Sequence, residues 1–227
     1  MQEKLLFDNL NLNERVYMRL RDKIINNELK PGSRIEYEQL IAELGVSRTP
    51  LRDALNRLQL DRLIEVKSRS GTYVSVPTPK DIQEIHDVRK PLECLAVKLS
   101  AIHITKKKYI EMLDEVDFVM DELKKGKTDT FFQSDRNFHN LLIQHSDNSR
   151  LITIMESLEL QIKWFGVIMT TNVDRPLNAN EMHRKIIKAM HDQRIDDAIK
   201  EMGKHIEEVK QDILNDFSHN QQQCLED

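Results

Sequence analysis

Residues 44–55 read LGVSRTPLRDAL, and this stretch decides how the N-terminal part of the chain folds. Gly45 is the residue type that most easily takes the left-handed conformation at the end of a helix. Ser47 can cap the start of the next helix, and Pro50 falls in its first turn, where a missing N–H costs little. The stretch therefore predicts two helices joined by a tight turn.

The flanking segments complete a recognisable order. Residues 13–27 carry apolar side chains at i, i+4 and i+8, which predicts an amphipathic helix, and residues 36–44 predict the helix that Gly45 ends. Downstream, two β-like stretches, 63–67 and 72–76, are separated by a short turn of the sequence SRSG. Helix, helix, turn, helix and hairpin is the order of a winged helix-turn-helix.

The remainder of the chain has no strand pattern. The sequence VPTP at 76–79 predicts a boundary, and amphipathic helices are expected beyond it at 79–102, 106–125, 130–146, 149–170, 179–192 and 195–216, followed by a frayed polar tail. We therefore expect a mainly α protein: a winged helix-turn-helix domain with a small β-hairpin wing over residues 1–77, then an all-α bundle of six to seven helices over residues 78–227.

Composition narrows the possible function classes. The chain of 227 residues is 39% hydrophobic and 32% charged, and its longest apolar run, 164–169, is far shorter than the roughly 20 residues of a membrane span. Its two cysteines, Cys94 and Cys224, lack CxxC spacing, which argues against a disulfide framework or a thiolate zinc site. With no signal-peptide pattern at the N-terminus, we expect a cytoplasmic protein without a membrane partner.

Charge is unevenly distributed along the chain. The net charge is −4, yet residues 1–78 hold 13 Lys/Arg against 11 Asp/Glu, and the remainder holds 21 against 27. A DNA-binding protein needs a local basic surface rather than an overall positive charge. The distribution supports DNA binding by the N-terminal part, although a difference of this size also arises from ordinary charge scatter.

The helix that starts after Ser47 has the features of a recognition helix. Arg48 and Arg52 are four residues apart and share the face opposite the leucine stripe. The N-terminal end of such a helix enters the major groove, where arginine binds guanine O6 and N7 with two hydrogen bonds. Ser47 and Thr49 can bind phosphates beside the free N–H groups of the first turn. The alternative is a solvated arginine face with ordinary capping.

Three further residues are DNA-contact candidates. Arg69 and Gly71 lie in the expected wing, where a narrow basic turn can contact the minor groove or phosphates. A polar hairpin with no DNA contact explains the same residues. Arg34, which follows the Pro31-Gly32 break, is a further candidate for a phosphate contact.

The second domain contains a possible set of metal ligands. Asp135 and His139 are four residues apart on one helix, while His183 and His205 belong to two other expected helices. These side chains can converge inside a helical bundle, where metal sites are commonly built. Such nitrogen and oxygen ligands suit zinc, nickel, manganese or iron. By itself, an aspartate–histidine pair at this spacing is more typical of a capping or surface pair.

Residues 14–76 resemble the winged-helix domain of the GntR regulator family. The resemblance is carried by LKPGSR at 29–34, LGVSRTPLRDAL at 44–55 and RSGTYV at 69–74. One departure is Glu36-Tyr37, where many members have Ser-Glu, which weakens the cap of the second helix and adds an acidic side chain near the DNA side. The resemblance implies a homodimer that binds a palindromic operator.

Residues 80–212 are similar to the FCD-type ligand-binding domain of the FadR subfamily. The matching segments are DRNFH at 135–139, Asn148 with Leu151, HRKII at 183–187, and Asp197 through Met202 to His205. The resemblance implies a divalent metal, zinc first and nickel, manganese or iron as alternatives, bound by Asp135, His139, His183 and His205. It also implies a small carboxylate effector near Arg89 and Asn148, although Arg89 can instead pair with Glu93 one turn along.

Together these features predict a ligand-responsive, non-enzymatic transcription regulator, most simply a repressor. Three alternatives stay open: a metal-free bundle pocket for an acyl-type ligand, a zinc ion that only stabilises the bundle, and a metal-dependent hydrolase. The hydrolase leaves the winged helix unexplained, and no general base stands out beside the four ligands.

Overall fold

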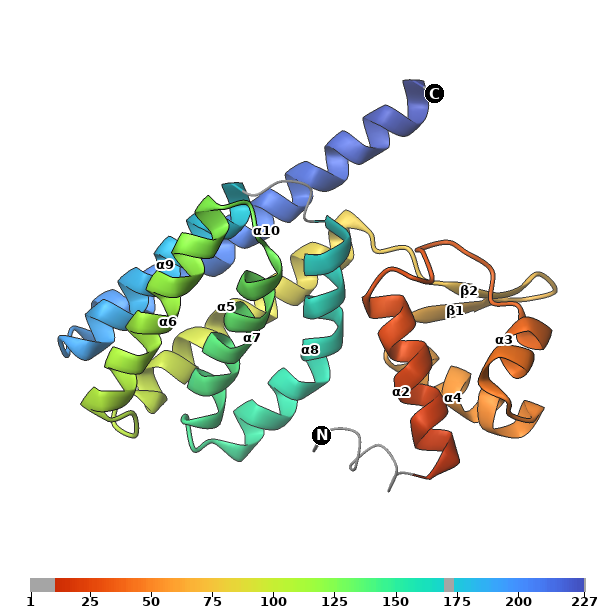
Figure 1. The fold of residues 1–227 in the computed structure, drawn as a ribbon, viewed down its shortest axis with the longest axis horizontal. Helices are drawn as coiled ribbons and strands as arrows, with labels where there is room; N and C mark the ends of the chain where they lie inside the picture. Colours follow the sequence, from red (N-terminus) through yellow and green to blue (C-terminus); the bar gives the residue numbers. More distant parts are fainter. Residues whose placement is uncertain (1–10, 170–173, 227) are drawn as a thin grey trace. The chain divides into compact units, whose positions relative to one another are not determined.

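The computed structural model describes residues 11–169 and 174–226 of the chain. Two compact units are distinguished, one formed by residues 1–78 with 159–168 and the other by residues 79–158 with 169–227. The first contains the winged helix and the second the helical bundle (Figure 1). The expected mainly α fold with one small hairpin is confirmed.

The winged helix follows the expected order within one or two residues. Its elements are α2 (Leu12–Ile25), α3 (Tyr37–Leu44), α4 (Arg48–Leu60), β1 (Ile64–Lys67) and β2 (Gly71–Val74). Helix α4 packs against α2, α3 and β1. It does so because Leu51, Leu55 and Leu58 form one apolar stripe that is buried, while the arginines on the opposite face stay exposed.

The turn between α3 and α4 has the predicted geometry. Gly45 ends α3 with φ 63° and ψ 37°, the left-handed conformation that a residue with a Cβ adopts only at a cost. Ser47 occupies the N-cap position of α4, but its side chain makes no capping hydrogen bond. Glu36, the departure from the family pattern, is the N-cap of α3 and likewise makes no capping bond.

The wing is a two-stranded antiparallel hairpin in which Ile64 pairs with Val74 and Lys67 with Gly71. Gly71 has φ +133°, and a Cβ placed there would lie 3.2 Å from Nε of Arg34. Glycine therefore permits both the backbone conformation and the close approach of the Arg34 side chain. An isolated bridge between Arg34 and Tyr73 joins the segment before α3 to the wing.

The second unit is a helical bundle. In the described part of the chain it contains α5 (Pro79–Ser100), α6 (Lys106–Lys124), α7 (Asp129–Gln144), α9 (Asp174–His191) and α10 (Ile195–Glu226). Helix α8 (Ser149–Met169) begins in this unit, and its residues 159–168 belong to the first unit. Helix α10 packs along α5 and α9, α6 packs on α7 and α9, and α7 also contacts α5 (Figure 1). The helices α5, α7, α9 and α10 thus enclose a common interior.

Two helix boundaries differ from the sequence expectation. Helix α9 begins at Asp174 rather than at 179, because Pro176 falls in its first turn, where N–H groups have no intrahelical partner. Helix α10 continues to Glu226 rather than ending near 216. The added segment is polar but contains no glycine or proline, so nothing in it interrupts the helix.

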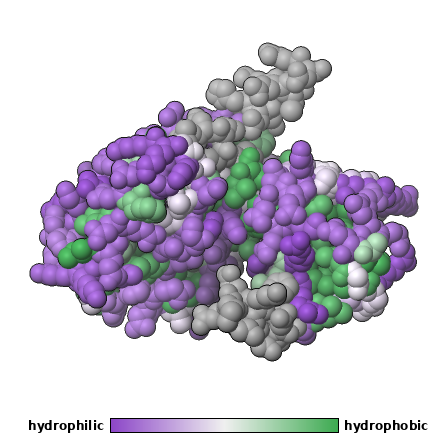
Figure 2. Space-filling view, viewed as in Figure 1, coloured by the Kyte–Doolittle hydropathy of each residue, from purple (hydrophilic) through white to green (hydrophobic). Residues whose placement is uncertain are grey.

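The face drawn in Figure 2 is mostly hydrophilic, with smaller hydrophobic areas between the charged residues. This is the surface expected of helices with one buried stripe. Among the described residues, no helix is both long and apolar enough to cross a membrane.

Candidate metal centre and nucleic-acid interface

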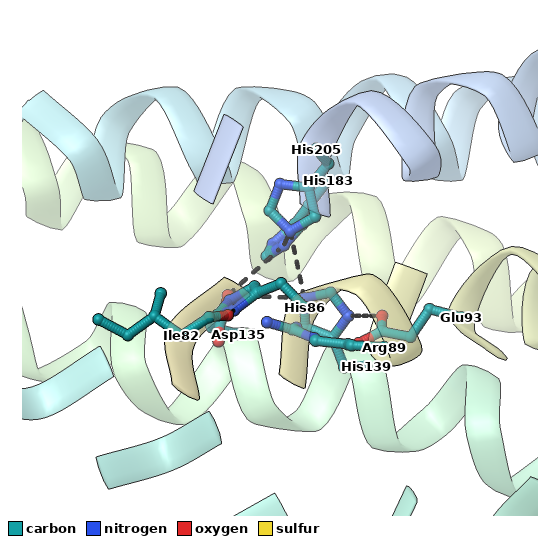
Figure 3. A network of polar contacts seen from close by, with 8 residues as sticks. All are labelled: Ile82, His86, Arg89, Glu93, Asp135, His139, His183 and His205. Carbon is teal, nitrogen blue, oxygen red and sulfur yellow. Dashed lines mark hydrogen bonds and ion pairs between the residues drawn. The ribbon is translucent and has the colours of Figure 1, made fainter. Parts of the chain in front are cut away.

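Four side chains from three helices meet in the interior of the bundle. The ligand atoms of Asp135, His139, His183 and His205 all lie within 4.8 Å of one another (Figure 3). Nε2 of His205 is 3.2 Å from Nε2 of His183 and 3.3 Å from Nε2 of His139. Oδ1 of Asp135 is 3.5 Å from His183 Nε2 and 3.8 Å from His139 Nε2.

Helix packing explains why these four residues meet. Asp135 and His139 are one turn apart on α7, which contacts both α5 and α9, while α9 in turn packs along α10. His183 on α9 and His205 on α10 are each buried on the face that packs against neighbouring helices. The imidazoles lie in the bundle interior together with the buried charged side chains of Arg89 and Glu93, and an uncompensated polar group in such a place is costly.

Two histidines of the cluster, His183 and His205, are kept neutral by their burial. Burial lowers the pKa of His183 well below its usual value, and the charges of His139 and Arg89 lower it further. Burial likewise lowers the pKa of His205 well below its usual value. A neutral imidazole keeps a lone pair on one nitrogen, which is the form that binds a metal ion.

Glu93 contacts the metal-ligand candidate His139, a contact that the sequence analysis did not predict because it gave Glu93 only as a partner for Arg89. Its carboxylate is 2% exposed, accepts a hydrogen bond from Nε of Arg89 at 2.5 Å, and accepts another from Nδ1 of His139. Although burial alone would raise the pKa of Glu93, the adjacent Arg89 and His139 lower it well below its usual range. The carboxylate thus fixes the proton of His139 on Nδ1 and leaves Nε2 facing the cluster.

Arg89 therefore forms the ion pair with Glu93 that the sequence analysis gave as the alternative to an effector contact. The Arg89 side chain is only 7% exposed and lies in the interior of the bundle with the cluster (Figure 3). It remains close enough for its charge to lower the pKa of both His183 and His205. The sequence signal for Glu93 was its position four residues after Arg89, on the same face of α5.

Asn148, which the family resemblance places near the effector, makes hydrogen bonds at the start of α8. Its side-chain oxygen accepts hydrogen bonds from the backbone N–H groups of Arg150 and Leu151, at 3.2 and 3.1 Å. These bonds cap the start of α8, because the first N–H groups of a helix have no intrahelical partner. Asn148 thus has a structural role as a helix cap, and its contact with an effector stays a prediction.

The candidate DNA-reading residues of α4 lie on the surface. Ser47, Arg48, Thr49 and Arg52 are all exposed. The guanidinium group of Arg48 donates a hydrogen bond to the carboxylate of Glu38 on α3, and both side chains are exposed to solvent. In the part of the chain that the structure describes, Arg52 has no ion-pair partner, so its guanidinium group is available to a ligand.

The other three DNA-contact candidates are brought together at the wing. Arg34, Arg69 and Gly71 line an open groove of about 580 Å³ between the start of α3 and the hairpin. Arg69 is exposed at the tip of the turn with φ 62°, while Nε of Arg34 lies 3.6 Å from Oε1 of Glu36. The acidic residue noted in the sequence therefore lies beside one of the basic candidates.

Known protein families match both the winged helix and the helical bundle. Residues 12–74 match the family described as bacterial regulatory proteins, gntR family, and residues 84–208 match the FCD domain. The chain is 30% identical over 204 residues to the uncharacterized HTH-type transcriptional regulator YdhC of Bacillus subtilis, covering 89% of this chain and 86% of that protein. It is 23% identical to the HTH-type transcriptional repressor RspR of Escherichia coli, with 89% of each chain covered.

A solved structure shows the same fold. A GntR transcriptional regulator from Rhodococcus sp. RHA1 superposes with a TM-score of 0.75 at 25% identity, covering 89% of this chain and 97% of that one. The order of elements, the recognition-helix motif and these matches lead to one conclusion. The chain belongs to the GntR family of bacterial transcription regulators and carries an FCD domain after its winged helix-turn-helix.

Proposed function

We propose that this regulator is a homodimeric repressor that binds a palindromic operator and responds to a small carboxylate through a metal-centred pocket. The observation that carries the proposal is the convergence of Asp135, His139, His183 and His205 within 4.8 Å. We take residues 1–77 as the DNA-binding domain and residues 78–227 as the domain for metal, effector and dimerisation.

The donor set fits a divalent cation. Zinc binds histidine nitrogen at about 2.0–2.1 Å, so two ligands of a tetrahedral ion stand about 3.3–3.4 Å apart. Nε2 of His205 lies 3.2 Å from Nε2 of His183 and 3.3 Å from Nε2 of His139, which is close to this spacing. An octahedral ion would place opposite ligands about 4.2 Å apart, within the 4.8 Å limit of the cluster, so nickel, manganese and iron also fit.

The same distances argue against a purely hydrogen-bonded cluster. A neutral His139 has its proton on Nδ1, because that nitrogen faces the carboxylate of Glu93, and its Nε2 then presents a lone pair. Nε2 of His205 faces both this lone pair and Nε2 of His183, yet one N–H can serve only one of them well. A cation would satisfy all three nitrogens at once, and Asp135 would balance part of its charge.

The bound metal would supply a Lewis-acid contact for an oxygen of the effector, and Arg89 would add a positive charge nearby. The effector would act by favouring one placement of the two DNA-reading heads, since a shift in equilibrium requires a difference in affinity between two states. On the DNA side, we assign base reading to Arg48 and Arg52, and phosphate or wing contacts to Arg34, Ser47, Thr49, Arg69 and Gly71.

The test compares wild-type protein with His139→Ala. We expect about one equivalent of divalent metal per chain in the wild type and a large loss in the variant, measured by elemental analysis. Full occupancy of the variant would remove His139 from the ligand set.

Titration with operator DNA, before and after chelation, then separates the possible roles of the metal. A metal that holds the effector changes the ligand response when removed. A purely structural zinc would lower only the melting temperature, and a metal-free acyl pocket would keep its ligand response after chelation.

A further inference from the structure

A groove of about 370 Å³ runs between α6 and α7 in the helical bundle, with one residue of α9 at its base. We call it the α6–α7 groove. Its volume is within the usual range for pockets that bind small molecules, about 300–1,000 Å³. Asp135, His139, His183 and His205 are not among the residues that line it, so its occupant does not depend on the proposed metal.

The floor of the α6–α7 groove is apolar. It is lined by the buried or half-buried side chains of Met112, Val116, Phe138, Leu141 and Ile187. The ring of Phe138 also stacks on the ring of His183, with centroids 4.2 Å apart, so the floor is held in place by packing beneath it. An aliphatic or aromatic group that covers this floor would be removed from water, which favours its binding.

The rim of the groove carries a net negative charge. Lys108, Glu111 and Glu115 line it, and Nζ of Lys108 lies 3.2 Å from Oε2 of Glu111, so these two charges offset each other. Glu115 is exposed and, among the described residues, forms no ion pair. Asn137, which also lines the rim, is neutral. Charge complementarity therefore favours a ligand with one positive charge over an anion.

Ser134 gives an independent indication of a ligand. It lines the groove and is only 8% exposed, yet within the described part of the chain its hydroxyl forms no hydrogen bond. Buried hydroxyl groups nearly always have a partner. A hydroxyl can accept a hydrogen bond, and the carboxylate of Glu115 can only accept. A cationic group with several N–H donors, such as an ammonium group, suits both.

We propose that the α6–α7 groove binds a small organic monocation, a primary amine with an aliphatic or aromatic body. Its ammonium group donates hydrogen bonds to Glu115 and Ser134, and its body covers the apolar floor. The groove shares no residue with the proposed carboxylate pocket, so either site can exist without the other. The regulator thus has a second small-molecule site, with the opposite charge preference.

The test uses the full-length protein in calorimetric titrations with matched probes. The amines are 2-phenylethylamine and isoamylamine, and their controls are 2-phenylethanol and isoamyl alcohol, which keep the body but lack the charge. At least one amine should bind about tenfold or more tightly than its alcohol, because a hydrogen bond to a charged group is stronger than a neutral one. Ethylamine, which has the charge but little apolar body, should bind more weakly than that amine by a similar factor.

Three variants locate the binding site. Glu115→Gln removes the charge at nearly the same shape, and should weaken amine binding about tenfold or more while leaving alcohol binding unchanged. Ser134→Ala removes the hydroxyl and should weaken amine binding severalfold. Asp114→Asn is the matched control, because Asp114 is an exposed carboxylate of the same helix that does not line the groove. This control should keep the wild-type amine affinity.

Each contrary outcome has a definite meaning. If neither amine binds the wild type at millimolar concentration, or if each binds no better than its alcohol, the groove is not a site for organic cations. Wild-type amine affinity in Glu115→Gln, or an equal loss in Asp114→Asn, would also refute the proposal, because the amine would then bind elsewhere or respond only to the overall charge of α6. An unchanged affinity in Ser134→Ala would remove the hydroxyl from the site. Circular dichroism checks the fold of each variant, and the comparison of probes on the wild type decides even if a variant does not fold.

Discussion

The carboxylate of Glu93 accepts a hydrogen bond from Nδ1 of His139, across 46 positions of sequence, and its other oxygen binds Arg89. This carboxylate–imidazole pair orients His139 toward the cluster. Because such outer partners typically change metal affinity by about 10–100-fold, we expect Glu93→Gln to weaken metal binding by that factor. Competition with a chromophoric chelator measures the affinity.

The matched control for this change is Glu84→Gln on the same helix. Glu84 is exposed, and its carboxylate only pairs with Lys80 at 3.6 Å, so its variant should bind metal as the wild type does. An unchanged affinity in Glu93→Gln would show that the carboxylate does not orient a metal ligand.

Arg52 is expected to contribute sequence-specific contacts to DNA. It is exposed on α4 one turn after Arg48, and its side chain has no structural partner to lose in the described part of the fold. Arg52→Ala should therefore leave the melting temperature within about 2 °C and reduce specific operator affinity by at least tenfold, since a bidentate guanine contact contributes about 1–3 kcal/mol. Fluorescence anisotropy with operator and scrambled DNA measures both affinities.

Arg150→Ala is the comparison for Arg52, because it removes the same charge from an exposed position in the helical bundle. It should change specific and nonspecific DNA affinity little. Equal operator affinity in Arg52→Ala and wild type would exclude Arg52 from base reading.

Glu38 is expected to weaken DNA binding through its ion pair with Arg48. DNA must compete with this carboxylate for the guanidinium group, and the acidic charge itself repels phosphate. Glu38→Gln should raise DNA affinity severalfold at low salt, with the gain shrinking as salt increases. A loss of affinity would instead mean that Glu38 holds Arg48 in its DNA-reading position.

Tyr17 is expected to stabilise the winged helix, and this contribution should depend on pH. Its hydroxyl donates to Asp61 at 2.7 Å, and the guanidinium carbon of Arg57 lies 3.8 Å from its ring centroid. Tyr17→Phe should lower the free energy of unfolding by about 1.5 kcal/mol at pH 7, because a hydrogen bond to a charged group is lost. Urea denaturation measures this. Tyr73→Phe should cost less, because among the described residues the hydroxyl of Tyr73 bonds only to the exposed Ser70.

The pH dependence of Tyr17 follows from its pKa. Burial raises the pKa of Tyr17 to about 12, and the hydrogen bond to Asp61 adds to this. The neutral hydroxyl is thus favoured in the folded state, so its stabilisation is complete below about pH 10 and is lost as the pH rises toward 12. The difference between wild type and Tyr17→Phe should shrink across that range. A constant difference would contradict the raised pKa.

The sequence alone determined the order of elements and most of the local geometry. The glycine at 45, the proline at 50 and the leucine stripe of α4 are local signals, and each acts through the backbone conformation or helical periodicity of its own segment. The same holds for Asp135 and His139, whose spacing places them on one helical face. The hydrogen bonds of Asn148 to the first turn of α8 are local as well, and the sequence analysis did not predict them.

Only the tertiary structure decided which distant side chains meet. The convergence of His183 and His205 with His139, the bond between Glu93 and His139, and the pairing of Arg48 with Glu38 join residues on different helices. The burial of His86, whose Nε2 has no hydrogen-bond partner among the described residues, likewise depends on the packing of several helices. Local propensity fixes where a helix begins and which face is apolar, whereas these contacts depend on how helices pack, which the hydrophobic interior as a whole determines.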